Sequence, residues 1–313
     1  WFIYQLMNYK IDNLQYCNWS RKIFEINRDA GLDAIHVTIV YHEDYDELLI
    51  EIKKWQKLFN ENSDLIFLGR NYNDIEPLFK DVDFVFHLAA ESRIQPSINN
   101  PIEAVEINVV GTCNVLQASR THNVKRVIYS STSAAYGLKN PIPLKETMIK
   151  DCLNPYSVSK TSGEELCKMY TDLFGLKTIT FRYFNVYGER QPLRGQYASV
   201  IGLFLRQLKN NESLTIVGDG LQTRDFTYVG DVVEANLAAL ECVEGFGEIF
   251  NIGTGVQINI LNLAKIVGGK SIHIDERIGE CRFTQADIIK AQNILNWKPK
   301  GNLVDWINKN KKL

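Results

Sequence analysis

Tyr156 and Lys160 stand four residues apart in the stretch NPYSVSK. On a helix, this spacing puts both side chains on one face, one turn apart. An ammonium group beside a phenol favours the phenolate and lowers a pKa that is ordinarily about 10, so the pair predicts a tyrosine that acts as a general base near neutral pH. The same spacing also occurs on helix faces that only meet solvent, so the surrounding sequence has to decide between the two interpretations.

Hydroxyl side chains precede this pair. The segment KRVIYS at 125–130 is typical of a strand and runs directly into Ser131, Thr132 and Ser133. Ligands of open α/β sheets bind at the carboxyl ends of the strands. These hydroxyl groups are therefore predicted to lie where a ligand binds.

The elements that position these residues alternate between short apolar runs and amphipathic stretches, which predicts an α/β fold with a mostly parallel sheet. The predicted strands are 33–41, 64–68, 83–88, 125–130 and 177–183, and the predicted helices are 44–60, 102–120 and 156–174. After about residue 190 the elements become shorter and more irregular, which is typical of a smaller lobe that contacts a substrate.

Composition narrows the class of protein. The 313 residues are 45% hydrophobic and 23% charged, enough for one large domain or two unequal ones. With 35 Lys and Arg against 37 Asp and Glu the net charge is -2, which gives no general attraction to nucleic acid or to an anionic membrane. The chain has six cysteines without a C-x-x-C pair, no apolar run of about 20 residues and no signal peptide, so it is expected to be cytoplasmic, without a membrane span or a metal site.

Further motifs surround the tyrosine and the lysine. In chain order the stretches are DVDFVFHLAA, EINVVGTCNVLQASR, VIYSSTSAAYG, NPYSVSK, FRYFNVYGERQ, IVGDGLQTRDFTYVGDVV, FNIGTG and RIGECRFTQADI. Together, over about residues 74–300, they resemble the extended short-chain dehydrogenase/reductases, specifically the nucleotide-sugar epimerases and dehydratases like UDP-glucose 4-epimerase. The resemblance implies a Rossmann-like doubly wound parallel sheet with a smaller C-terminal substrate lobe, NAD as cofactor and a UDP-sugar as substrate.

The resemblance also implies roles for individual residues. The implied catalytic residues are Tyr156, which is the base, Lys160, which holds the nicotinamide ribose and tunes that tyrosine, Thr132, which hydrogen-bonds the sugar hydroxyl, and its neighbour Ser131. The implied cofactor contacts are Ala89, Ala90, Asn108, Tyr156, Lys160 and Tyr183. The implied substrate contacts are Asn185, two arginines that clamp the diphosphate, Arg224 and Arg277, and an acid that binds the nucleotide ribose, Glu280.

The implied reaction is epimerisation at C4 of the sugar. Tyr156 takes the proton of the C4 hydroxyl while a hydride passes to NAD+, and the resulting 4-keto sugar is reduced on its other face. A dehydratase usually carries acidic residues directly after the Ser/Thr hydroxyl, where this chain has Ser133, which favours an epimerase. The choice between glucose, N-acetylglucosamine and a uronic acid stays open.

The family further implies a homodimer. It pairs through the two helices that correspond to 102–120 and 156–174, in a four-helix interface. The apolar residues of these helices, among them Val105 and Leu116, could equally all pack on the sheet. The sequence leaves both arrangements open.

The N-terminal segment departs from the family. Such enzymes open with a strand and G-x-x-G-x-x-G, but here the only glycines before Gly111 are Gly31 and Gly69. The one N-terminal strand-to-helix junction that the pattern predicts, at 41–44, carries acidic side chains that repel a pyrophosphate. An alternative hypothesis is therefore a non-catalytic nucleotide-sugar-binding protein, or a fusion remnant, that lacks the NAD fingerprint.

Residues 10–72 instead resemble the start of the membrane-type (renal) zinc dipeptidases. The metal pair of that family falls near Leu14 and Tyr16, which do not bind zinc, so peptidase activity is not predicted. The expected organisation is an atypical first β-α-β unit at 1–72, an NAD domain at 73–190 and a substrate lobe at 191–313, with part of 225–252 returning to the NAD domain.

Overall fold

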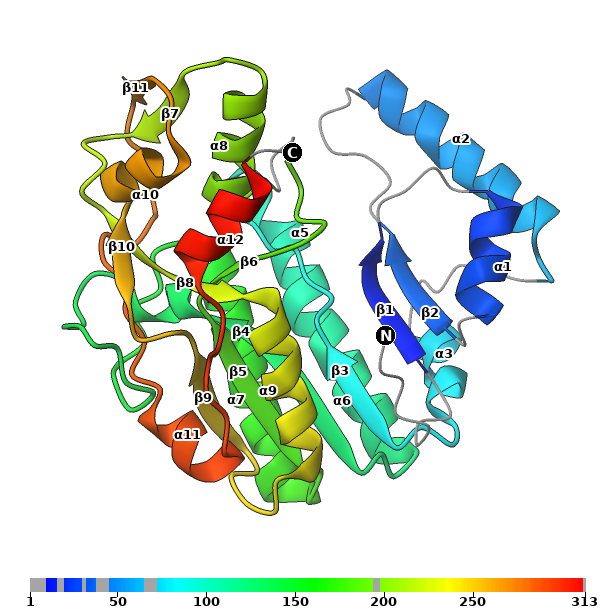
Figure 1. Cartoon of the computed structure of the whole chain (residues 1–313). Helices are drawn as coiled ribbons and strands as arrows, with labels where there is room; N and C mark the ends of the chain where they lie inside the picture. Colours follow the sequence, from blue (N-terminus) through cyan, green and yellow to red (C-terminus); the bar gives the residue numbers. More distant parts are fainter. Residues whose placement is uncertain are drawn as a thin grey trace.

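The central layer is a sheet of four parallel strands in the order β3-β4-β5-β9 (Figure 1). The structure is a computed structural model, and it describes residues 10–15, 20–29, 32–37, 45–64, 72–193 and 198–311. The four strands are β3 (Phe84–His87), β4 (Arg126–Thr132), β5 (Thr178–Tyr183) and β9 (Glu248–Ile252). Because all of them are parallel, their carboxyl ends meet at one edge. The predicted parallel sheet is confirmed.

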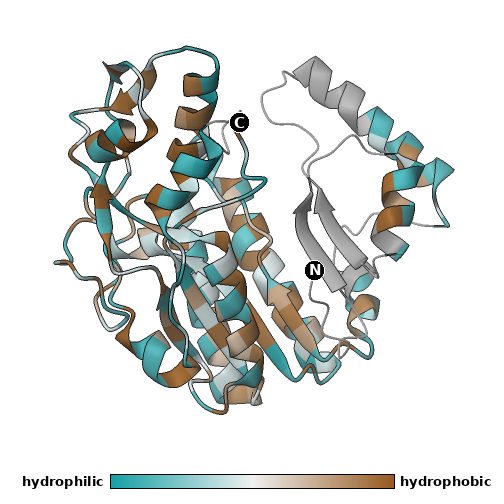
Figure 2. Cartoon of the chain, in the orientation of Figure 1, coloured by the Kyte–Doolittle hydropathy of each residue, from teal (hydrophilic) through white to brown (hydrophobic). Residues whose placement is uncertain are grey.

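Helices cover both faces of this sheet. The side chains of β4 alternate between the two faces: Val127 and Tyr129 join one core cluster, whereas Ile128 joins another. The first cluster lies under α6 (Gly111–Thr121) and α7 (Pro155–Phe174), and the second under α9 (Val229–Glu241) and α11 (Ile289–Leu295). Figure 2 shows hydrophobic and hydrophilic residues alternating along these flanking helices, as expected for helices with one buried face.

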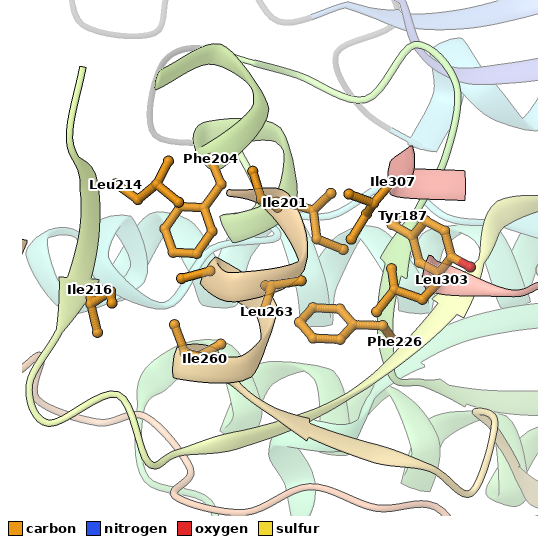
Figure 3. Close-up of a cluster of buried hydrophobic side chains, with 12 residues drawn as sticks. Tyr187, Ile201, Phe204, Leu214, Ile216, Phe226, Ile260, Leu263, Leu303 and Ile307 are labelled. Atoms are coloured by element: carbon orange, nitrogen blue, oxygen red, sulfur yellow. The ribbon is translucent and has the colours of Figure 1, made fainter. Parts of the chain in front are cut away.

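The C-terminal lobe has its own core. Its strands are β6 (Asn185–Tyr187), β7 (Leu214–Val217), β8 (Thr223–Tyr228), β10 (Gln257–Asn259) and β11 (Ser271–Ile274). Its helices are α8 (Val200–Lys209), α10 (Ile260–Val267) and α12 (Leu303–Asn310). Figure 3 shows how Phe204, Leu263 and Phe226 from three different elements meet in this core.

The N-terminal part is a separate β-α-β unit. Its elements are β1 (Lys10–Gln15), α1 (Arg21–Asp29), β2 (Leu32–Val37) and α2 (Tyr45–Glu61). Strands β1 and β2 pair in parallel with each other, and within the described strands neither joins β3. The buried rings of Phe24 and Trp55, 6.5 Å apart, hold α1 against α2. The predicted helix 44–60 is confirmed as α2.

One prediction for this N-terminal unit is wrong, and two others concern residues that the structure does not describe. The expectation of a single N-terminal strand-to-helix junction is wrong, because β1 and α1 form an earlier one. Both elements are short and rich in polar residues, so neither contains a continuous apolar run. The predicted junction at 41–44 and most of the predicted strand 64–68 lie outside the described residues.

Short helices link these layers. They are α3 (Tyr72–Ile75), the 3-10 turn Glu76–Phe79, α4 (Ile94–Asn99), α5 (Pro101–Val105), the π-helical turn Glu106–Val110 and the 3-10 turn Ser133–Tyr136. The predicted helix 102–120 is thus α5 and α6 joined by a π-helical turn. None of the helices in the described ranges is long and apolar enough to cross a membrane.

Candidate active site

Helix α7 presents Tyr156 in its first turn. Asn154 caps the helix by accepting a hydrogen bond from Ser157 N at 2.8 Å, and Pro155 occupies the first helical position. The helix ends at Gly175, whose φ of 70° is the left-handed conformation that glycine adopts readily. These local signals place the start of α7, and so Tyr156, within the reach of β4.

One cavity of about 850 Å³ gathers most of the predicted site residues. It lies between the carboxyl edge of the central sheet and the C-terminal lobe. The predicted residues that line it are Ser131, Thr132, Tyr156, Tyr183, Asn185, Arg224, Arg277 and Glu280. The other four predicted residues, Ala89, Ala90, Asn108 and Lys160, are not part of its lining.

The pKa of Tyr156 is raised. Burial is the main cause, while a hydrogen bond with Thr132 and the positive charge of Arg93 lower it and the charge of Glu91 raises it. The expectation that Lys160 produces a net lowering of this pKa is therefore wrong for the described structure. Thr132 is the hydroxyl partner of Tyr156 in this structure, and its implied contact with the sugar hydroxyl stays a prediction.

Lys160 lies inside the fold, 2% exposed, with Nζ 4.4 Å from the centroid of the Tyr129 ring. Burial lowers its pKa to about 7, because an ammonium group loses its hydration there. The face of the Tyr129 ring partly stabilises the positive charge of the Lys160 ammonium group. Lys160 is thus one helical turn from Tyr156, but its ammonium group is directed at β4.

Ser131 is held by a buried ionic network. Its Oγ donates a hydrogen bond of 2.6 Å to Glu164, which also accepts from Arg182 and lies 3.0 Å from Lys150 Nζ. The hydroxyl group is therefore committed to the protein interior. This contact favours a positioning role for Ser131 over the catalytic role that was expected.

Asn108 makes three hydrogen bonds within the protein. Its amide accepts from Glu91 N and donates to Glu91 O and to Ser159 Oγ, at 2.8 to 2.9 Å, and the residue is fully buried. These bonds connect the loop after β3 to α7. Ala89 and Ala90 lie in that loop, directly after β3, so Asn108 positions the segment in which two of the implied cofactor contacts lie.

The two predicted diphosphate arginines meet at one carboxylate. Arg224 donates to Glu280 Oε2 at 3.3 Å, and Arg277 lies 3.9 Å from Glu280 Oε1. Two guanidinium groups against one carboxylate leave a net positive charge in this part of the cavity. Asn185, at the start of β6, and Tyr183, which exchanges hydrogen bonds with Asn236, line the same cavity.

Two functional residues were not predicted from the sequence. Arg93 lines the cavity and acts on Tyr156, but an isolated arginine after a strand carries no motif of its own. Asn154 could have been found, since an asparagine before a proline is typical of a helix N-terminus.

The described residues fit the nicotinamide half of NAD. Within the described chain, Lys160 Nζ contacts the Tyr129 ring and makes no hydrogen bond, so its donors remain for ribose hydroxyl groups. Tyr156, in the first turn of α7, and Tyr183, at the end of β5, both line the cavity. Gly111 is the first glycine among the described residues, and the loops that follow β1 and β2 lie outside them.

Comparison with known proteins shows the family of this chain. A family model described as "NAD dependent epimerase/dehydratase family" matches residues 49–253. The chain belongs to this family. The match begins before residue 74, so the epimerase likeness reaches further toward the N-terminus than the quoted motifs. The likeness of 10–72 to the dipeptidases stays a prediction.

Individual members of the epimerase family are similar over most of the chain. The putative UDP-glucose 4-epimerase of Methanocaldococcus jannaschii is 38% identical over 282 residues, 81% of this chain and 91% of that protein. The UDP-glucose 4-epimerase of Thermotoga maritima with UDP-glucose has a TM-score of 0.78 and 29% identity over 97% of both chains. The UDP-glucuronic acid 4-epimerase of Bacillus cereus, with UDP-glucuronic acid and NAD, has a TM-score of 0.74 and 28% identity over 97% of this chain and 98% of that one.

Proposed function

We propose that this chain is an NAD-dependent nucleotide-sugar 4-epimerase that acts on a UDP-sugar. One observation carries the proposal: a tyrosine with a hydroxyl partner, Tyr156 and Thr132, lines the same cavity as the arginine pair Arg224 and Arg277. A molecule with a sugar at one end and a diphosphate at the other matches this combination of groups. Membership of an NAD-dependent epimerase family supports the reaction class.

The residues at the carboxyl edge of the sheet bind and transfer the proton of the C4 hydroxyl of the sugar. When bound, NAD supplies reversible hydride acceptance at C4 of the sugar. Tyr156 removes the proton from the C4 hydroxyl and later returns it, and Thr132 orients the oxygen by a hydrogen bond. Lys160 would donate to the ribose hydroxyl groups of the bound cofactor.

The residues of the C-terminal lobe bind the diphosphate. Guanidinium groups bind phosphate oxygens through paired hydrogen bonds, and Arg224 is only 13% exposed, so its charge is weakly screened. Glu280 holds both arginines in place and is the group proposed to bind the nucleotide ribose. Two arginines and one glutamate have a net positive charge, which favours a dianionic ligand over a neutral sugar.

We also propose that the protein forms a homodimer through the helices around 102–120 and 156–174. Apolar side chains on these helices remain outside the core: Ile102 is 72%, Val105 43% and Val158 49% exposed. Leu116, in contrast, is completely buried. Only part of the apolar surface of these helices is therefore used on the sheet, and the rest is free for a second copy.

The test is an assay for C4 inversion. Purified protein with added NAD+ is mixed in turn with UDP-glucose, UDP-N-acetylglucosamine and UDP-glucuronate, and the C4 epimer is followed by proton NMR. We expect one or more to be converted, and Tyr156→Phe to lower turnover about 100- to 10,000-fold while UDP still binds.

A protein that binds UDP but converts none of these sugars at saturating NAD+ would contradict the proposal. That outcome would favour the non-catalytic nucleotide-sugar-binding protein. The alternative is not favoured, because the proteins that are similar over most of the chain include several epimerases, one of them solved with both NAD and a UDP-sugar.

A further inference from the structure

The segment 275–281 carries Arg277 and Glu280 but has few backbone contacts. Within the described chain, its backbone makes no hydrogen bonds with the backbone of other segments. Two of its carbonyl oxygens accept from side chains instead. Gly279 O accepts from Asn154 Nδ2 at 2.8 Å, and Ile278 O from Gln95 Nε2 at 3.1 Å.

Asn154 is at the same time the cap of the helix that carries the base. Its Oδ1 accepts from Ser157 N at 2.8 Å, and the residue is only 6% exposed. Tyr156 lies two residues further on, and its own backbone N–H donates to Ser97 of α4 at 3.0 Å. One amide therefore holds the helix of Tyr156 by its oxygen and the segment of Arg277 by its nitrogen.

The two segments also lie beside each other at Gly279. This glycine has φ +82°, and a Cβ placed there would lie 3.6 Å from Asn154 Cβ and 3.4 Å from Ile98 Cδ1. The hydrogen bond from Asn154 Nδ2 to Gly279 O is thus the contact that joins the segment of Arg277 to the start of α7 at this point.

We propose that Asn154 is a positioning residue that sets the place of the arginine pair relative to Tyr156. This inference rests on the proposed function, since a UDP-sugar would touch both groups at once. When the bond to Gly279 is lost, the diphosphate site is held less firmly, and a substrate bound there presents its C4 hydroxyl to Tyr156 less often.

The variant Asn154→Asp isolates this bond. An aspartate still accepts from Ser157 N and still caps the helix, but it has no N–H to donate to Gly279 O. Asn154→Ser also keeps a cap and adds no charge. The matched control is Asn302→Asp at the start of α12, where the asparagine caps the helix through Asp305 N at 3.1 Å outside the cavity lining.

Three measurements are made on the full chain. For both Asn154 variants we expect the thermal midpoint to stay near that of the parent, UDP to bind about 3- to 10-fold more weakly by calorimetry, and trypsin to cleave after Arg277 faster when no UDP is added. When the assay uses a UDP-sugar that the parent protein converts, we expect kcat to fall and KM to rise in both Asn154 variants. Asn302→Asp leaves all of these values unchanged.

The outcomes separate the two proposals. Unchanged trypsin cleavage and unchanged UDP affinity in both Asn154 variants would overturn the positioning role. A rise in KM with kcat unchanged would show that Asn154 does not align the bound sugar with Tyr156. Asn154 would then only hold the segment 275–281 in place. If the parent protein bound no UDP, the proposed function would fail, while the cleavage rates would still decide whether Asn154 holds the segment.

Discussion

Arg182 and Glu164 form a paired ionic contact between β5 and α7, with Nε–Oε1 at 2.8 Å and Nη2–Oε2 at 2.7 Å, and each side chain is 1% exposed. Glu164 lies two turns after Tyr156 on the same face of α7. It also accepts from Ser131, the neighbour of Thr132. The pair therefore fixes the helix of the base against the strand of its hydroxyl partner.

Glu164→Gln should be strongly destabilising. It leaves Arg182 buried without its counter-charge, so we expect the free energy of unfolding to fall by about 3 kcal/mol, measured in urea at pH 7. Replacing both residues, Glu164→Leu with Arg182→Met, should cost less than the single change, because no charge is then stranded. A single variant as stable as the parent would show that the pair is not a structural link.

The buried Lys160 should make the free energy of unfolding depend on pH. Burial lowers its pKa to about 7, whereas an unfolded chain holds this proton up to about 10.4. Between these values the unfolded state binds more protons, so this group makes stability rise with pH, by at most about 1.4 kcal/mol per pH unit. Urea unfolding at pH 7, 8 and 9 should show this slope reduced in Lys160→Met. Equal slopes in parent and variant would contradict a neutral buried amine.

Thr132→Val should shift the pH dependence of catalysis. The hydrogen bond from Thr132 lowers the pKa of Tyr156, so its loss raises that pKa further. A base must be deprotonated to act, and the rising limb of kcat/KM should therefore move to higher pH, with a roughly 2- to 10-fold loss at pH 7. Thr132→Ser keeps the hydroxyl and should restore the parent profile. A uniform loss at every pH would indicate only misplacement of the substrate.

Val105→Glu should dissociate the proposed homodimer. A carboxylate in an apolar interface loses its hydration without a partner. Sedimentation at micromolar concentration should give a dimer for the parent and a monomer for the variant. The control is Val243→Glu, at a valine that is 88% exposed after the end of α9 and far from these helices in the chain. If the parent itself sediments as a monomer, the proposed interface is wrong.

Much of the fold followed from local sequence signals. The strands β3, β4 and β5 were predicted because their apolar runs are short and bounded, and α7 because its periodicity runs from Pro155 to Gly175. β1 and α1 were missed, since both are short and polar and neither contains a continuous apolar run. The π-helical turn around Asn108 was missed as well, because it depends on bonds to Glu91 and Ser159.

The sequence by itself determined which residues are proposed to carry the chemistry. The spacing of Tyr156 and Lys160, the hydroxyl of Thr132 after a strand and the order of the motifs are properties of the chain alone. Only the tertiary structure decided how these groups are tuned and held: burial raises the pKa of Tyr156, the ammonium of Lys160 faces Tyr129, and Asn154 reaches Gly279. The physical reason is that residue types and local periodicity act over a few positions, whereas desolvation and hydrogen bonding depend on groups far apart in sequence that meet only in the folded chain.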